Sequence, residues 1–241
     1  MSETDDPRLP VGPVVAGWTS RSPPPRTPIA GRICRLEPVS VAKHAAELHA
    51  AFLADITGRG WRYLPYGPYG SVGRFADWLE ATCRGHDPLF CAIIPNATGR
   101  AAGLASFLRI DPPNGVIEIG HIHFSPELAR TAAATEALYL MMQRVFDELG
   151  YRRCEWKCDA LNAVSRRAAE RLGFTYEGTF RQAAVVKGHN RDTAWYALLD
   201  HQWPAARRAF VAWLDPANFD AQGRQRHTLA ELRGAGSSRG H

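Results

Sequence analysis

Apolar residues recur every three or four positions in several stretches of the chain, which is the spacing of one buried helix face. Glycine follows two of these stretches, at Gly150 and Gly173, where helix C-termini favour it. The pattern predicts helices over residues 41–55, 71–83, 131 or 135 to 149, 162–172 and 204–214.

Shorter apolar or alternating runs bounded by turn residues predict β-strands. These runs cover residues 32–38, 89–94, 101–110, 116–124, 152–158, 177–186 and 193–200. Turn residues at 96–99 and 111–115 separate three consecutive strands, which favours an antiparallel meander. A strand–helix–strand crossover follows, so the order predicts an α/β fold with a mixed, mostly antiparallel sheet and helices on both faces.

The two ends of the chain differ in composition from its centre. Residues 1–30 hold seven prolines and few large apolar side chains, which predicts a flexible arm. Residues 222–241 are rich in Gly, Arg and Ser and are expected to be similarly loose. We therefore expect an arm over 1–30, one domain over 31–203, and a C-terminal helix with a flexible tail over 204–241.

Charge and cysteine usage restrict the class of protein. The 241 residues carry a formal net charge of +5, which suits either nucleic acid or a phosphate-rich cofactor. The basic residues are dispersed, so we expect no nucleic-acid partner. Five cysteines without a C-x-x-C pair argue against a disulfide framework and a metal site. Neither an apolar run of ~20 residues nor a secretory leader is present, so we expect a cytoplasmic protein without a membrane partner.

Residues 116–137 run from a predicted strand through a loop directly into a helix. A helix N-terminus presents unpaired N–H groups and the positive end of the helix dipole. Small side chains at 131–134 leave room for a phosphate, and Arg130 adds positive charge beside them. The stretch is therefore either a pyrophosphate-binding site or an ordinary helix start with alanines chosen for propensity.

Residues 162–178 open a second helix, at Asn162, and close with a glycine before the next strand. Asn162 suits the N-cap position, where asparagine is common. Ser165 falls in the first turn, where its hydroxyl faces either a ligand or solvent.

Together these stretches resemble the GNAT superfamily of acetyltransferases, and most closely its branch of ribosomal-protein N-terminal acetyltransferases. The matching text is EIG, ATEAL, NAVSRRAAERLGF and EGTFR, in the right order and roughly the right spacing over residues 31–203. The resemblance implies the GNAT fold, whose central sheet is splayed in its middle. One departure is clear, because the superfamily motif Q/R-x-x-G-x-G/A reads here as alanine at Ala129, Ala132 and Ala134.

The resemblance implies acetyl-CoA as co-substrate, with Glu118 as general base and Ser165 as the donor that protonates the departing thiolate. An amine that is protonated at neutral pH needs such a base before it can attack. The implied contacts to acetyl-CoA are Ile122, His123, Phe124, Arg130, Thr131, Ala132, Ala133, Ala134, Thr135, Asn162 and Ser165. Alternation along the strand predicts Glu118 on one face, with His121 and His123 on the other face beside Ile117. Because histidine titrates near neutral pH, His121 and His123 are rival candidates for the base.

The loop at residues 61–69 is rich in aromatic residues and is the predicted acceptor pocket. Its aromatic residues Trp61, Tyr63 and Tyr66, together with His121 and Arg181, are the predicted substrate-binding residues. The alternative for the loop is packing over the core.

The sequence thus predicts an N-acetyltransferase that moves an acetyl group directly to an amine, either a protein N-terminus or a small molecule. No cysteine stands where the resemblance would mark a covalent intermediate. A non-catalytic acyl-CoA-binding or regulatory protein of the same fold is the alternative. We expect a monomer or a homodimer.

Overall fold

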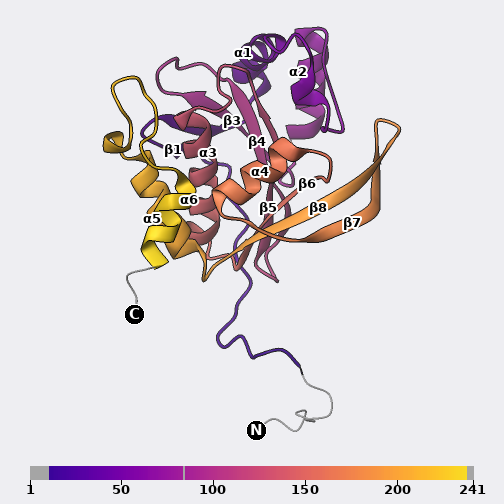
Figure 1. Ribbon diagram of the computed structural model, residues 1–241. Helices are drawn as coiled ribbons and strands as arrows, with labels where there is room; N and C mark the ends of the chain where they lie inside the picture. The colour runs from indigo at the N-terminus through magenta and orange to yellow at the C-terminus, as the bar shows by residue number, and fades with distance from the viewer. Residues whose placement is uncertain (1–10, 84, 238–241) are drawn as a thin grey trace.

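The computed structural model describes residues 11–83 and 85–237. It contains an eight-stranded sheet in the order β1-β2-β3-β4-β5-β6-β8-β7, in which only β5 and β6 are parallel neighbours (Figure 1). The strands are β1 Ile29–Ala30, β2 Cys34–Pro38, β3 Leu89–Pro95, β4 Gly103–Asp111, β5 Val116–Phe124, β6 Arg153–Asp159, β7 Thr175–Val186 and β8 His189–Leu199. The predicted mixed, mostly antiparallel sheet is confirmed.

Helices cover both faces of the sheet, as expected, and each side has its own apolar core. α1 and α2 pack with Trp61, Phe90 and Leu104 on one face. The second and larger core lies on the other face, beneath α3, α4, α5 and α6. The helices are α1 Val41–Leu53, α2 Val72–Cys83, α3 Ala132–Gln143, α4 Ala163–Leu172, α5 Trp203–Leu214 and α6 Leu229–Ser237, with short helical turns η1 Arg59–Trp61, η2 Arg144–Glu148 and η3 Pro216–Asn218.

The start of α3, which the sequence marks as a binding site, is held to β2 by a buried carboxylate. Glu136 accepts hydrogen bonds from the backbone N–H groups of Arg32, Ile33 and Cys34, at 3.1, 2.6 and 2.7 Å. A buried carboxylate needs such donors to offset its lost hydration. Glu136 therefore fixes the first turns of α3 relative to the backbone that enters β2.

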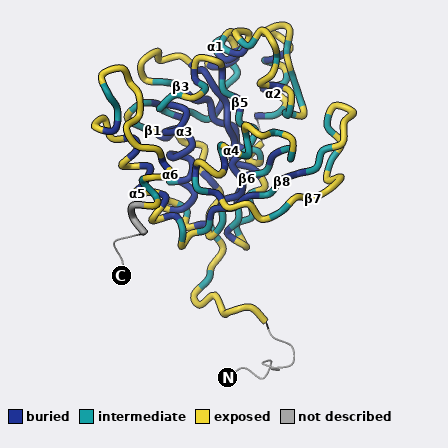
Figure 2. The backbone as a smooth tube through the Cα atoms, in the orientation of Figure 1, coloured by how far each residue is buried: buried dark blue, intermediate teal, exposed yellow. Residues whose placement is uncertain are grey.

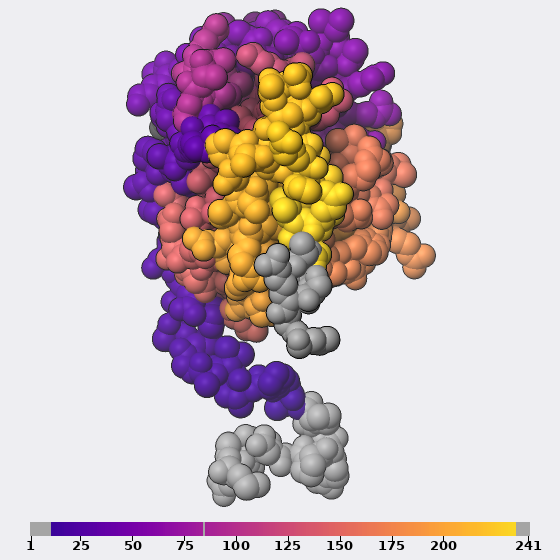
Figure 3. All heavy atoms as spheres, turned by 60° about the vertical axis from the view of Figure 1, so that its left-hand side comes forward, coloured from indigo at the N-terminus to yellow at the C-terminus, as the bar shows by residue number. Residues whose placement is uncertain are grey.

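Three features were not predicted from the sequence. β1 is only two residues long, and the predicted helix to residue 149 ends in a π-helical turn, η2. The segment expected to be loose after residue 222 contains α6, whose Leu229 is buried and which packs beside α5 (Figure 3). Residues 1–10 of the expected arm and 238–241 of the expected tail lie outside the described residues.

The strand β7 forms the far edge of the sheet and is largely exposed (Figure 2). Together with β8 it makes a long hairpin that projects from the domain (Figure 1). Lys187 at the tip of this hairpin donates to the carbonyl oxygen of Trp61 at 2.8 Å. The hairpin therefore reaches the loop that the sequence marks as the acceptor pocket.

Candidate active site

The two parallel strands β5 and β6 diverge after a short paired stretch. They pair at three positions, which are Val116 with Arg153, Ile117 with Cys154 and Glu118 with Glu155. β5 then continues to Phe124 and β6 to Asp159, with no further pairing between these two described strands. Glu118 belongs to the last pair and so stands where the opening, here called the splay, begins.

Two cations hold the carboxylate of Glu118. Its Oε2 atom lies 2.7 Å from Arg109 Nη1 and 3.1 Å from Lys157 Nζ, and Lys157 also lies 2.7 Å from Glu155 Oε2. Burial raises the pKa of Glu118 above its ordinary value, and the charges of Lys157 and Arg109 oppose that rise. The base implied by the resemblance is thus a buried carboxylate in a charged network.

A β-bulge in β5 determines which side chains share the face of Glu118. His121 has a left-handed backbone, with φ of 51°, and the β4–β5 register shifts at this point. The extra residue reverses the alternation of side chains after Gly120. The prediction that His121 and His123 share the face of Ile117 is therefore wrong.

Ring contacts place both histidines on the α1–α2 side of the sheet. His121 lies 5.1 Å from Phe90, and His123 lies 4.1 Å from Phe52, measured between ring centroids. Burial lowers the pKa of each histidine to about 4. Both rings are therefore neutral and weakly basic at neutral pH, which favours Glu118 over them as the base.

The aromatic loop at residues 61–69 packs in part over the core, which was one of the two alternatives for it. Trp61 is buried and packs its ring 4.0 Å from His123, so it belongs to the core. Tyr66 bonds His121 Nδ1 at 2.9 Å, and the hydroxyl of Tyr63 donates to the carbonyl oxygen of Leu161 at 3.3 Å. Tyr66 therefore links the loop to β5, and Tyr63 links it to the turn between β6 and α4.

The start of α3 has the geometry of an N-capped helix. Thr131 Oγ1 accepts a hydrogen bond from Ala134 N at 3.1 Å. The N–H groups of the two residues between them belong to the first turn, which has no intrahelical carbonyl to bond. Thr135 accepts a bond from Arg171 of α4 at 2.8 Å, and Arg130 is exposed with a left-handed φ of 64°. The arrangement can accept an anion at the first-turn amides.

Asn162 and Ser165 are joined at the start of α4. Asn162 Oδ1 accepts from Ser165 N at 3.1 Å, so Asn162 has the N-cap role considered for it. The hydroxyl of Ser165 accepts from Trp156 Nε1 at 3.0 Å and lies beside the thiol of Cys158. Ser165 thus faces the middle of β6.

Glu118 and Ser165 approach the splay from opposite faces of the sheet. Glu118 contacts Lys157, whereas Ser165 contacts Trp156, and successive side chains of a strand point to opposite faces. A ligand group inserted between β5 and β6 would therefore lie between the side chains of Glu118 and Ser165. Arg181, another predicted substrate-binding residue, is exposed on β7. The pKa of Asp192 is lowered by hydrogen bonds from Gln182 and Asn190, with a smaller contribution from the charge of Arg181.

Three cations near the splay were missed by sequence reasoning. They are Arg109, Lys157 and Arg191. Lys157 had a recognisable pattern, because a lysine between Trp156 and Cys158 in a buried strand needs a carboxylate partner. The other two lie near the splay only through strand pairing.

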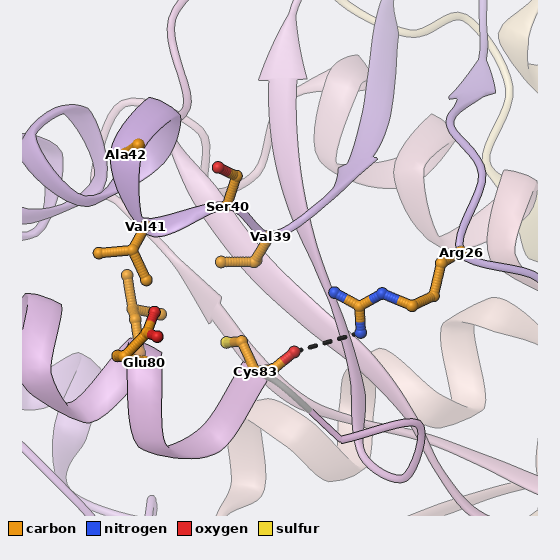
Figure 4. Close-up of a pocket in the computed structure, with 8 residues that line it drawn as sticks. Arg26, Val39, Ser40, Val41, Ala42, Glu80 and Cys83 are labelled. Atoms are coloured by element: carbon orange, nitrogen blue, oxygen red, sulfur yellow. Dashed lines mark hydrogen bonds between the residues drawn. The ribbon is translucent and has the colours of Figure 1, made fainter.

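A separate hollow, drawn in Figure 4, lies away from the splay. It has a volume of about 550 Å³ and lies between the N-terminal turn of α1 and the end of α2. Arg26 borders it and donates to the carbonyl oxygen of Cys83 at 3.2 Å. Among the described residues no cluster of three or more potential metal ligands exists, and no helix combines the length and apolar character that a membrane span requires.

Known proteins of one family resemble this chain in sequence and in fold. The model of the acetyltransferase (GNAT) domain matches residues 34–175. A crystal structure of a GCN5-related N-acetyltransferase from Brucella melitensis is 50% identical, with a TM-score of 0.90 over 91% of this chain and 100% of that one.

Two further relatives are more distant. The Bacillus subtilis protein named "Putative ribosomal N-acetyltransferase YdaF" is 30% identical over 105 residues, which are 44% of this chain and 57% of the relative's length. The ribosomal-protein acetyltransferase RimL, solved in complex with coenzyme A, is 22% identical, with a TM-score of 0.61 over 71% of this chain and 97% of that one. The likeness to RimL shows the fold alone.

Proposed function

Because this chain belongs to the GNAT acetyltransferase family, we propose that it transfers the acetyl group of acetyl-CoA directly to an amine. The observation that carries the proposal is the divergence of β5 from β6 directly after Glu118. A thioester in that opening would have the Glu118 carboxylate on one side and the Ser165 hydroxyl on the other.

Two features support binding of acetyl-CoA. Beyond Glu118 the β6-facing edge of β5 has no strand partner among the described residues, so peptide groups at 122–124 are available to the pantetheine arm. The first-turn amides of α3, at Ala132 and Ala133, are available to the diphosphate, with Arg130 nearby. The methyl group of Ala132 stands where the usual glycine has a hydrogen, so it leaves the diphosphate less room at the first-turn amides.

We assign the proton transfers to two residues. Glu118, directly or through one water, accepts a proton from the amine, whose nitrogen then attacks the thioester carbonyl. As the C–S bond breaks, the Ser165 hydroxyl donates its proton to the departing thiolate. Trp156 already donates to Ser165 Oγ, so the hydroxyl proton of Ser165 points away from Trp156, toward the thiol of Cys158 or toward a bound thioester.

A non-catalytic acyl-CoA-binding protein is the second candidate. It is favoured by the engagement of Glu118 Oε2 with both Arg109 and Lys157, which competes with proton acceptance. The alanine at Ala132, where the superfamily motif usually has glycine, is equally consistent with either candidate.

The two candidates differ in the release of CoA thiol. The test incubates the protein with acetyl-CoA and a library of peptide N-termini and small-molecule amines, and measures free thiol and acetylated product. Calorimetric binding of acetyl-CoA is measured in parallel. Amine-dependent thiol release supports the transferase, binding without release from any amine supports the second candidate, and absence of binding contradicts both.

A further inference from the structure

Arg191 lies on β8 at the opening of the splay. It stands two residues before Thr193, which pairs with the last residue of β6, and so shares a face with Thr193 and Trp195. Trp195 pairs with Lys157, whose ammonium group contacts Glu118. Arg191 therefore belongs to the face of the sheet that carries Glu118, beyond the paired part of β6.

The guanidinium group of Arg191 is close to both strands of the splay. Burial is the main cause of the lowered pKa of His121 on β5, and the charges of Arg109 and then Arg191 add to it. Burial raises the pKa of Cys158 on β6, which the hydrogen bond of Ser165 and then the charge of Arg191 oppose. The Nε atom of Arg191 is buried and has no hydrogen-bond partner among the described residues. A buried donor without a partner is uncommon in a folded protein and calls for a ligand or water.

The neighbouring charges leave Arg191 uncompensated. Near Arg191, three cations and three carboxylates form ion pairs with one another. Arg109 and Lys157 pair with Glu118, Lys157 and Arg153 pair with Glu155, and Arg153 also pairs with Glu177. Arg191 has no ion pair within the described part of the chain. Lys187, on the same hairpin, donates only to the neutral carbonyl of Trp61 among the hydrogen bonds described. Two cations of the hairpin, Arg191 and Lys187, therefore have no carboxylate partner among the ion pairs of the described residues.

We propose that the acceptor amine also carries an anionic group, a carboxylate or a phosphate, and that the guanidinium of Arg191 binds it. This inference rests on the proposed function, since it concerns the acceptor of the same site. The planar fork of a guanidinium matches the oxygen atoms of both groups. The anion would lie between β8 and His121, which leaves the amine of the same molecule free to approach Glu118.

The test compares amines that differ only in the anion. Each pair is assayed for kcat/KM with acetyl-CoA: γ-aminobutyrate with 4-aminobutanamide, O-phosphoethanolamine with ethanolamine, and an acidic peptide with its amidated form. We expect the anionic member of at least one pair to be preferred about tenfold or more, since a charge-assisted hydrogen bond is lost in the other. The pair that shows the preference identifies the anion as carboxylate or phosphate.

Variants then locate the preference. Arg191→Gln is expected to raise KM for the anionic amine and bring the ratio of the pair near one, whereas Arg191→Lys keeps part of it. Arg208→Gln, at an exposed arginine on α5, is the control and leaves the ratio unchanged. Should Arg191→Gln fail to fold, Arg191→Lys takes its place, and a ratio that Arg191→Lys leaves unchanged would count against Arg191.

Two results overturn the inference while the transferase stands. They are equal turnover of charged and neutral members in every pair, and a preference that Arg191→Gln leaves intact. Absence of thiol release from any amine contradicts the proposed function itself.

Discussion

Trp156 donates its indole N–H to the hydroxyl oxygen of Ser165 over 3.0 Å and so joins the middle of β6 to the first turn of α4. Ser165 is also held by its own backbone N–H, which donates to Asn162. Two fixed bonds orient the hydroxyl, so its position is set before any ligand arrives. Such pre-orientation is what a proton donor to a leaving group requires.

Replacing Ser165 by Ala should slow acetyl transfer by about 10- to 100-fold and leave acetyl-CoA affinity nearly unchanged, because only the proton donor is lost. Trp156→Phe keeps an aromatic ring but removes the bond that orients the hydroxyl, so a smaller loss is expected. Stopped-flow measurement of thiol release, with binding measured by calorimetry, checks both variants. An unaltered rate in Ser165→Ala would remove Ser165 from the mechanism.

Glu118→Gln should lower kcat by about 10²- to 10⁴-fold, because the amide cannot accept the proton of the amine. Binding of acetyl-CoA should change little. Glu127→Gln, at an exposed glutamate in the loop before α3, is the matched control. Full activity of Glu118→Gln would discard Glu118 as the base.

The pH dependence of kcat/KM follows from the same carboxylate. As a base Glu118 acts when deprotonated, so activity should rise with pH through a pKa above the ordinary carboxyl value of 4.5. Arg109 lies 2.7 Å from the carboxylate and lowers this pKa, so Arg109→Gln should move the midpoint to higher pH. A pH–rate profile with Arg208→Gln as control measures the shift. A midpoint that moves to lower pH contradicts the assignment.

The periodicity of the sequence was sufficient for most of the fold but not for the face on which each site residue lies. Strand β5 was predicted with its observed bounds, because its alternation and flanking turns are local properties. The bulge at His121 arises from pairing with β4, which no local pattern contains. Alternation therefore assigned His121 and His123 to the wrong face.

The ion-pair partners of Glu118 could not be predicted from local sequence either. The place of Glu118 on a strand was evident, but Arg109 and Lys157 come from two different neighbouring strands and meet it only in the folded sheet. α6 was missed for another reason, because the tail was judged by its overall Gly, Arg and Ser content, although the first five residues of α6, LAELR, are good helix formers. Packing against α5 adds to the stability of α6.

Glu136→Gln should lower the free energy of unfolding by about 1–3 kcal/mol, since the three backbone N–H groups at the start of β2 lose a charged acceptor. The amide keeps one acceptor oxygen but turns an NH₂ group toward other donors. Urea unfolding followed by circular dichroism measures the change, and Glu127→Gln again serves as control. A loss no larger than that of the control would show that the contacts of Glu136 are not stabilising.

Stability at mildly acid pH should depend on the buried histidines. His123 has a folded-state pKa of about 4 against an ordinary value of 6.5, so between these values the unfolded chain binds more protons than the folded one. Stability is therefore complete above pH 6.5 and is lost as pH falls toward 4. His123→Phe keeps an aromatic ring beside Phe52 and Trp61 but does not titrate, so it should lose less stability between about pH 7.5 and about pH 5. Urea midpoints at the two pH values, with the exposed His201→Gln as control, measure the difference; equal losses in wild type and His123→Phe would contradict the prediction.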